Sequence, residues 1–244
     1  MIGSVAMAIA LIGVWQLIAD AELIPAVFLP GPAAAFDALL AEAETGELWR
    51  AIAGTVLLMA EGFFAASLVG ISLGIVIGLS PRARAYFEPT LEVLRPLPAT
   101  AIIPVAILLL GLTQSMIVAV IAFGALWPVL LGTIQGLKTI EPRLIQLSRV
   151  LEMSRTNFVR KIALPNAVPD IFAGLRLALT ISLILAVVTE MLSAQPGLGS
   201  VILIAARSFR SADLYGGVAV LGLLGFVTNT AIERLERWAL RWRD

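Results

Sequence analysis

The segment 140–177, IEPRLIQLSRVLEMSRTNFVRKIALPNAVPDIFAGLRL, is the one long part of the chain that is not simply apolar. The basic residues Arg143, Arg149, Arg155, Arg160 and Lys161 interrupt its first part, and hydrophobic stretches lie on both sides of it. A basic, partly amphipathic segment between membrane helices has two interpretations. It is either an inert loop held on its side of the membrane by charge, or a docking surface for a soluble partner.

The composition indicates a membrane protein. The chain has 244 residues, of which 59% are hydrophobic and only 14% are charged, whereas soluble domains carry about 25% charged residues. One core of this size cannot bury so much apolar surface, so lipid must cover part of it. The sequence therefore predicts an all-α polytopic membrane protein, with residues 1–244 forming a single transmembrane domain.

Several residue types that catalytic sites often need are missing. The chain contains no Cys and no His, which removes disulfides, thiol metal sites and the commonest general base. A net charge of zero does not favour a nucleic-acid partner. The sequence also lacks the G-x-x-x-x-G-K-[ST] phosphate loop, so ATP cannot bind in that way. We expect a non-catalytic chain that binds no metal and no cofactor of its own.

Apolar stretches of about 20 residues predict six transmembrane helices. They lie at about residues 2–19, 52–79, 95–112, 116–137, 168–192 and 214–232. The segment 33–46, between the first two spans, is short, acidic and amphipathic, which favours an aqueous surface. Within the second span, Gly70, Gly74 and Gly78 recur every four residues and predict close packing of another helix.

The positive charges are concentrated on one predicted side of the membrane. With six spans, thirteen Lys and Arg residues share a side with both termini, and three lie on the opposite side. The positive-inside rule then places the termini and the region 140–166 in the cytoplasm, and the segment 33–46 outside.

The cytoplasmic region has an imperfect helical periodicity. If it were one helix, its apolar residues Leu144, Leu147, Leu151, Phe158 and Ile162 would lie within a narrow arc. Arg155 interrupts that arc, and a turn near residues 153–156 would divide the region into two helices. The pattern by itself fits a membrane-surface helix and a partner-binding helix equally well.

This region also resembles the signature loop of bacterial ATP-binding-cassette importer permeases. That family's pattern is Glu-Ala-Ala, three residues, Gly, nine residues, then Ile-x-Leu-Pro. Residues 162–165, Ile-Ala-Leu-Pro, match the end of the pattern in full. Counting back places Glu152 at the family's glycine and residues 146–148, Gln-Leu-Ser, at its Glu-Ala-Ala. If the turn needs a positive φ, Glu152 is less favourable there than glycine.

Other stretches extend the resemblance to nearly the whole chain. Residues 94–99 followed by 103–104, and residues 189–191 followed by 197–199, resemble the sulfonate, taurine and nitrate permease subfamily. The resemblance implies a type I ABC importer permease fold, with a cytoplasmic coupling helix between the fourth and fifth spans, in the bacterial inner membrane.

The resemblance also implies partners and site residues. Two copies of the chain would line one pathway, two copies of a separate ATPase would hold ATP and Mg, and a periplasmic or lipid-anchored binding protein would deliver a small anionic solute. The coupling residues would be Gln146, Leu147, Ser148, Leu151, Glu152, Met153, Ser154, Phe158, Ile162, Leu164 and Pro165.

Four polar residues lie at or near the predicted membrane depth, namely Glu61, Arg95, Gln114 and Glu190. Charge inside a membrane is costly, so each is a candidate for a solute pathway; the alternative for Arg95 and Glu190 is that they only terminate helices. Hydropathy leaves one alternative function open, a secondary transporter or channel that is not coupled to an ATPase.

Overall fold

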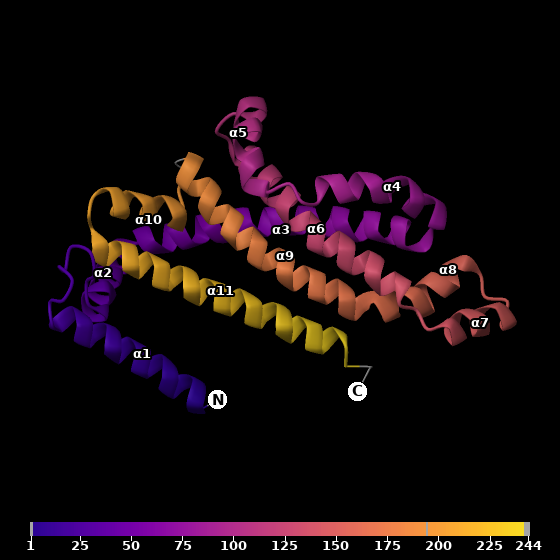
Figure 1. The fold of residues 1–244 in the computed structure, drawn as a ribbon, viewed down its shortest axis with the longest axis horizontal. Helices are drawn as coiled ribbons and strands as arrows, with labels where there is room; N and C mark the ends of the chain where they lie inside the picture. Colours follow the sequence, from indigo (N-terminus) through magenta and orange to yellow (C-terminus); the bar gives the residue numbers. More distant parts are fainter. Residues whose placement is uncertain (1, 194, 242–244) are drawn as a thin grey trace. The chain divides into compact units, whose positions relative to one another are not determined.

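The computed structural model describes residues 2–193 and 195–241, with the side chains of residues 2, 4, 5 and 8 outside that description. All regular elements in these ranges are helical (Figure 1). They are α1 (Ile2–Asp20), α2 (Pro32–Thr45), α3 (Glu47–Leu79), α4 (Pro81–Leu94), α5 (Ala99–Leu110), α6 (Gln114–Lys138), α7 (Pro142–Val150), α8 (Arg155–Phe158), the π-helical turn η1 (Val159–Ala163), α9 (Leu164–Ser193), α10 (Leu198–Arg207) and α11 (Ser211–Ala239).

The chain divides into two compact units. Residues 1–57 and 187–225 form the first, here called the terminal unit, and residues 58–186 and 226–244 form the second, the central unit. The expectation of a single transmembrane domain over residues 1–244 stays a prediction.

Four helical segments in the described part of the chain are long and apolar enough to cross a membrane. They are Glu47–Leu79, Gln114–Lys138, Arg155–Ser193 and Ser211–Ala239, and the bent pair of α4 and α5 makes a fifth if it counts as one span. Helix α1 has 19 residues, close to the roughly 20 that a bilayer requires, but the candidate spans of the described residues do not include it. The total of six spans therefore stays a prediction.

The predicted third span, residues 95–112, differs most from the structure. Its helix, α5, runs over only 12 residues, or about 18 Å at the usual rise, against a hydrocarbon core of about 30 Å. Pro96 and Pro98 disfavour the helical conformation in the residues before them, and α4 lies at 91° to α5 across this break.

Helix α4 was not predicted, although the Ser80 hydroxyl accepts from the Ala83 N–H at its start, over 3.2 Å, and Pro81 follows the cap.

Close helix packing organises the central unit. The predicted glycine stripe is confirmed, since Gly70, Gly74 and Gly78 of α3 face Val129, Thr133 and Leu137 of α6. A Cβ atom on Gly74 would lie 2.5 Å from the Thr133 Cβ, and one on Gly78 would lie 2.7 Å from the Leu137 Cδ1. Because these three positions of α3 carry no side chain, α6 can pack closely against them.

The terminal unit has its own small core. Leu48 and Ala51 of α3 and Leu198 of α10 are buried together, and partly buried residues of α2 and α11 pack against them. Helix α2 forms nearly all of the predicted amphipathic segment 33–46, and Gly46, whose φ of 79° is left-handed, caps its C-terminal end. The external position of this segment stays a prediction.

Candidate functional site

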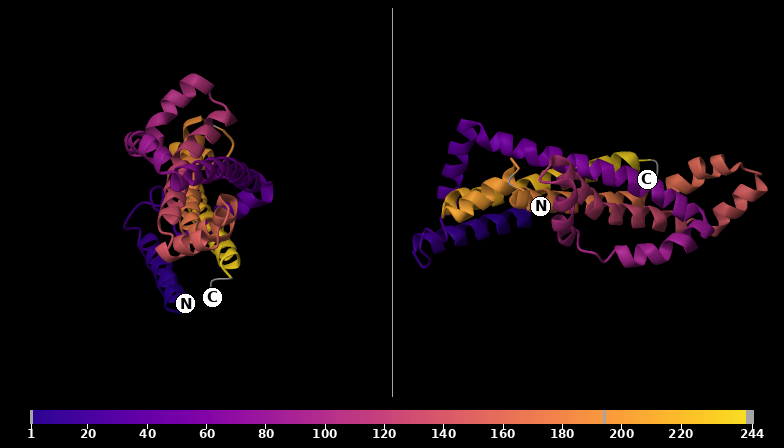
Figure 2. Two further views of the ribbon diagram at one scale, coloured as in Figure 1. Left: turned by 90° about the vertical axis from the view of Figure 1, so that its right-hand side faces the viewer. Right: turned by 90° about the horizontal axis from the view of Figure 1, so that it is seen from above.

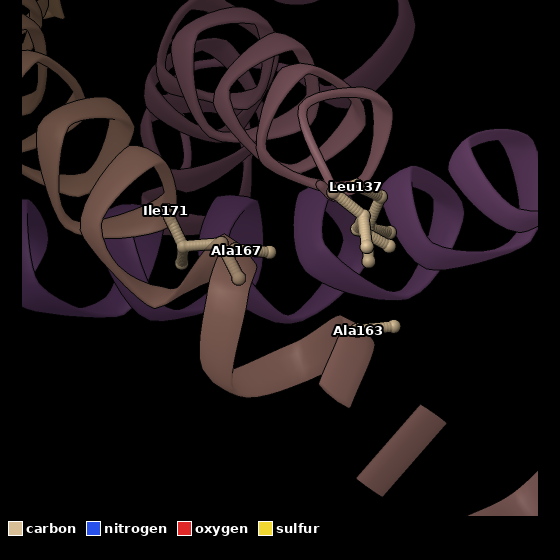
Figure 3. Close-up of a cluster of buried hydrophobic side chains, with 5 residues drawn as sticks. Leu137, Ala163, Ala167 and Ile171 are labelled. Carbon is tan, nitrogen blue, oxygen red and sulfur yellow. The ribbon is translucent and has the colours of Figure 1, made fainter. Parts of the chain in front are cut away.

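The region 140–166 is attached to the central unit at both of its ends. Ile140 follows α6 and is buried with Leu137, while Ala163 of η1 and Ala167 and Ile171 of α9 complete the cluster (Figure 3). The Asn166 side chain donates from Nδ2 to the carbonyl oxygen of Gly136 over 3.1 Å. The ends of α6 and α9 are therefore held together where the region leaves and returns.

Between these ends, α7 and α8 extend beyond α6 and α9 (Figures 1 and 2). Helix α7 has two unlike faces. Leu144 and Ile145 pack against the buried cluster, and Ser148 is buried, with its hydroxyl donating to the Ile145 carbonyl over 2.8 Å. On the other face Leu147 is 48% exposed, Val150 79% and Leu151 61%. We call Leu147, Val150 and Leu151 the outer apolar face.

The turn after α7 is closed by a left-handed residue. The Met153 N–H donates to the Ser148 carbonyl over 2.9 Å, and the Glu152 N–H donates to the Arg149 carbonyl over 3.1 Å. This pair of bonds is a Schellman motif, in which the residue after the helix cap is left-handed. That residue is Glu152, with a φ of 48°. The turn thus needs the conformation that glycine adopts most easily, although glutamate occupies it.

A second helix begins directly after this turn, so the predicted division into two helices is confirmed. The exposed Ser154 caps α8, its hydroxyl accepting from the Asn157 N–H over 3.3 Å. The chain then widens into η1, where the Leu164 N–H bonds to the Val159 carbonyl five residues back. A π-turn at this place accommodates Pro165, which has no N–H to donate to the preceding turn.

Of the remaining predicted coupling residues, some are exposed and others are half-buried. Gln146 is exposed, like Leu147 and Leu151. Phe158 and Ile162 are half-buried and pack against the cluster that attaches the region, and Met153, Leu164 and Pro165 are also half-buried. The five residues expected to share one narrow helical arc therefore lie on two different sides of the region. Leu144, Phe158 and Ile162 face inward, while Leu147 and Leu151 face outward.

The region 140–166 also carries exposed positive charge. Arg149, Arg155, Arg160 and Lys161 are all exposed, and none of them has an ion-pair partner among the residues that the structure describes. A cavity of about 500 Å³ lies where the region rejoins α9, lined by Thr139, Leu144, Lys161, Ile162, Pro165, Asn166, Pro169 and Asp170. A region that exposes both apolar and basic groups fits a partner that offers apolar and acidic groups.

Two of the predicted pathway residues form a pair in the central unit. The Gln114 Nε2 donates to the Glu61 carboxylate over 2.9 Å, and both side chains are exposed. Arg95 is exposed at the break between α4 and α5 and lines two hollows of the same unit.

Glu190, the fourth pathway candidate, has no exposed surface. Its Oε2 accepts from the Thr55 hydroxyl over 3.0 Å and from the Gly199 N–H over 2.9 Å. Within the terminal unit the carboxylate thus joins α3, α9 and α10. Roles of these four residues in a pathway stay predictions.

Sequence reasoning missed the partners of several charged residues. Arg176 of α9 forms a hydrogen-bonded ion pair with Glu236 of α11, and Lys138 pairs with Glu88 of α4 over 3.7 Å. Only the opposite charges signal these contacts, because the partners lie 60 and 50 positions apart in the chain. Arg176 is therefore neutralised by a neighbour within the protein.

Comparison with protein families gives a match over most of the chain. A family model described as "binding-protein-dependent transport system inner membrane component" matches residues 66–243. That range includes the whole region 140–166.

Individual proteins match over nearly the full length. A Bacillus subtilis (strain 168) protein named as an aliphatic sulfonates transport permease is 30% identical over 96% of this chain and 85% of its own length. The taurine transport system permease protein of Escherichia coli (strain K12) is 29% identical over 95% of this chain and 86% of its own. The bicarbonate transport system permease protein of Synechococcus elongatus is 31% identical over 93% and 85%.

Among solved structures, a chain of the MetNI methionine ABC transporter in an inward-facing conformation has a TM-score of 0.70 to this structure. It is 19% identical, and the match covers 81% of this chain and 98% of that one. The likeness shows a shared fold.

Proposed function

Because this chain belongs to the family of binding-protein-dependent transport system inner membrane components, the permease subunits of ABC importers, we propose that its region 140–166 docks a separate ATPase subunit. That ATPase binds ATP and Mg and hydrolyses the nucleotide. The permease couples hydrolysis to alternating access of a membrane pathway, and it is not itself an enzyme.

The observation that carries this proposal is the outer apolar face. Leu147, Val150 and Leu151 expose about half or more of their surface, and they lie outside the candidate membrane spans of the described residues. Exposed apolar groups with a polar border are typical of protein interaction sites. The exposed arginines of the region orient an approaching partner and raise its association rate.

Because the region is attached at both ends, it can act as a lever that transmits movement of α7 to the membrane helices. Ile140 and Ala163 fix the region to α6 and to the beginning of α9. A displacement of α7 by the ATPase subunits is transmitted to these two helices, because the close-packed cluster cannot absorb it. The half-buried Phe158 and Ile162 act as inner contacts of the lever, while Gln146 and Ser154 lie on its exposed side.

The complete importer contains more than this chain. We infer that two copies of the permease form the pathway, that each docks one ATPase subunit, and that a periplasmic or lipid-anchored binding protein delivers the solute. Both termini of the chain lie on the cytoplasmic side of the inner membrane. The thirteen-to-three charge asymmetry supports this orientation.

The solute is a small anion of the alkanesulfonate, taurine or nitrate class. Support comes from the names of the relatives, which transport sulfonates, taurine and bicarbonate. The test is uptake by vesicles that contain the permease, its ATPase and its binding protein, with labelled taurine, ethanesulfonate, nitrate and bicarbonate offered separately. We expect ATP-dependent uptake of one anion class. Equal uptake by the permease alone, with no ATPase present, would contradict the proposal and indicate a secondary carrier.

A further inference from the structure

The cavity of about 500 Å³ where the region 140–166 rejoins α9 lies within the central unit. Its volume falls in the range of roughly 300–1,000 Å³ that is typical of ligand pockets. Such pockets combine apolar walls with a few polar groups that select the ligand. The apolar walls here are Leu144, Ile162, Pro165 and Pro169. The polar residues of the lining therefore indicate the chemical class of a ligand.

The lining contains one cation and one anion that do not neutralise each other. Lys161 is exposed and Asp170 is half-buried, and neither forms an ion pair with any residue that the structure describes. The Asp170 carbonyl oxygen packs against Gly132 of α6, so the surface that Asp170 leaves accessible belongs mainly to its side chain. Partial burial of an unpaired carboxylate is unfavourable. A ligand with a positive group would relieve that cost.

Asn166 offers a second acceptor near this carboxylate. It precedes Asp170 by about one helical turn, so both side chains lie on the same face of α9. The Asn166 Nδ2 donates to the Gly136 carbonyl over 3.1 Å, which holds the amide in place and leaves its Oδ1 to accept from a ligand. The Lys161 ammonium carries three donors on a flexible stem. The cavity thus offers acceptors on α9 and a mobile cationic donor on η1.

We propose that this cavity binds a zwitterion, with its ammonium group on Asp170 and Asn166 and its sulfonate, carboxylate or phosphate group on Lys161. The ligand is a free aminosulfonate or amino acid, or the headgroup of phosphatidylethanolamine, and these sources share one recognition chemistry. The cavity adjoins the ends of the predicted spans 116–137 and 168–192, on the predicted cytoplasmic side, where solutes and headgroups both have access. The site goes beyond the proposed function, because binding requires neither the ATPase nor transport.

The test uses a single introduced thiol, since the chain has no Cys. Thr139→Cys places the thiol at an exposed position of the cavity wall. Gln146→Cys, exposed on α7 and outside the lining, is the control. Modification by the neutral reagent N-ethylmaleimide is timed for the purified permease in nanodiscs of phosphatidylglycerol, a lipid without an ammonium group. One arm adds taurine, ethanesulfonate or ethanolamine. The other replaces part of the lipid with phosphatidylethanolamine and adds no solute.

We expect saturable slowing at position 139, and none at position 146, in at least one arm, and the arm identifies the source of the zwitterion. In the solute arm, taurine should bind about tenfold or more tightly than either comparison compound. Ethanesulfonate lacks the ammonium group, and ethanolamine lacks the sulfonate. Each therefore leaves one of the two charged side chains without a partner.

Substitutions test each half of the site separately. Asp170→Asn should abolish the preference for taurine over ethanesulfonate, and Lys161→Gln should abolish the preference for taurine over ethanolamine. In the lipid arm, either substitution should abolish the slowing by phosphatidylethanolamine. Arg160→Gln and Glu141→Gln, at exposed residues outside the lining, should change none of these results. Each preference is a ratio measured within one variant, so a change in stability alone does not alter it.

Two results would overturn the proposal. One is an unchanged rate at position 139 in both arms, together with no heat of taurine binding to the unmodified protein in calorimetry. The other is a set of ligand preferences that stays the same in Asp170→Asn and Lys161→Gln. Neither result bears on docking of the ATPase, because the experiment contains only the permease.

Discussion

The Thr55 hydroxyl donates a hydrogen bond to the Glu190 carboxylate over 3.0 Å, and neither side chain has any exposed surface. The same hydroxyl accepts from the Leu198 N–H over 2.9 Å, while the Gly199 N–H donates to the carboxylate over 2.9 Å. Two side chains thus hold the first turn of α10 against α3 and α9 in the terminal unit. Gly197 lies against the carboxylate, at a place where no Cβ atom would fit.

Replacing Thr55 with Val keeps the shape of the side chain and removes both of its hydrogen bonds. The Leu198 N–H and the Glu190 oxygen then lose a partner, and the free energy of unfolding should fall by roughly 1–3 kcal/mol. Unfolding of the purified protein in mixed micelles measures this change. Thr55→Ser should retain most of the stability, and Thr180→Val, an exposed hydroxyl that bonds only within its own helix, should change little. Equal effects at Thr55 and Thr180 would contradict the role of this pair.

Glycine at position 152 should stabilise the region 140–166. A left-handed conformation costs a side-chain-bearing residue roughly 1–2 kcal/mol, and part of that gain is offset by the larger conformational freedom of glycine in the unfolded chain. We expect Glu152→Gly to slow proteolysis at this exposed turn and Glu152→Val to speed it. Glu141→Gly, at an exposed residue whose φ is −57°, is the control and should not slow proteolysis. Faster cleavage of Glu152→Gly than of the unmodified protein would contradict the prediction.

A single methyl group at position 74 should separate α3 from α6. In Gly74→Ala the new Cβ would lie 2.5 Å from the Thr133 Cβ, and overpacking of this kind costs roughly 1–3 kcal/mol. Gly222→Ala is the matched control, because no atom lies within 4 Å of the added Cβ there. Thermal unfolding should show a clear loss of stability for the first variant only. Similar melting temperatures for both would mean that the glycine stripe does not set the helix spacing.

Glu42 of α2 should make the stability of the protein depend on pH. Burial, and then the nearby carboxylate of Asp213, raise the pKa of Glu42 above its ordinary value of 4.5. The folded state therefore favours the neutral acid, so the stabilising contribution is full below the ordinary pKa and is lost as the pH rises through the raised one. Glu42→Gln removes this dependence. Its melting temperature should equal that of the unmodified protein at pH 4 and exceed it at pH 7.5, and an advantage only at pH 4 would contradict the assignment.

Local patterns in the sequence predicted some of the structure well. The four-residue spacing of Gly70, Gly74 and Gly78 is visible in the sequence because it repeats on one helix face. The family pattern has glycine at position 152, and glycine is typical of the left-handed conformation that Glu152 adopts. Pro96 and Pro98 could have indicated the break between α4 and α5, and the cap formed by Ser80 and Pro81 could have revealed α4.

Contacts between distant segments could not be predicted in the same way. Whether Leu147 or Leu144 faces outward depends on which side of α7 packs against the buried cluster, and the turn at Glu152 changes the phase of the residues beyond it. Thr55 and Glu190 lie 135 positions apart, and nothing local in either segment indicates that they share a hydrogen bond. Hydropathy likewise cannot distinguish a continuous span from the bent pair of α4 and α5.

Docking of the ATPase through the outer apolar face is the central claim, and ATPase coupling in Leu151→Asp measures it most directly. Leu151 is 61% exposed, so the substitution should leave the permease folded while placing a charge in the interface. In reconstituted vesicles we predict that the variant loses at least about tenfold of its solute-stimulated ATP hydrolysis and of its uptake. Leu235→Asp, at a leucine that is 53% exposed on the C-terminal part of α11, should keep both. Full stimulation and uptake in Leu151→Asp would contradict the account.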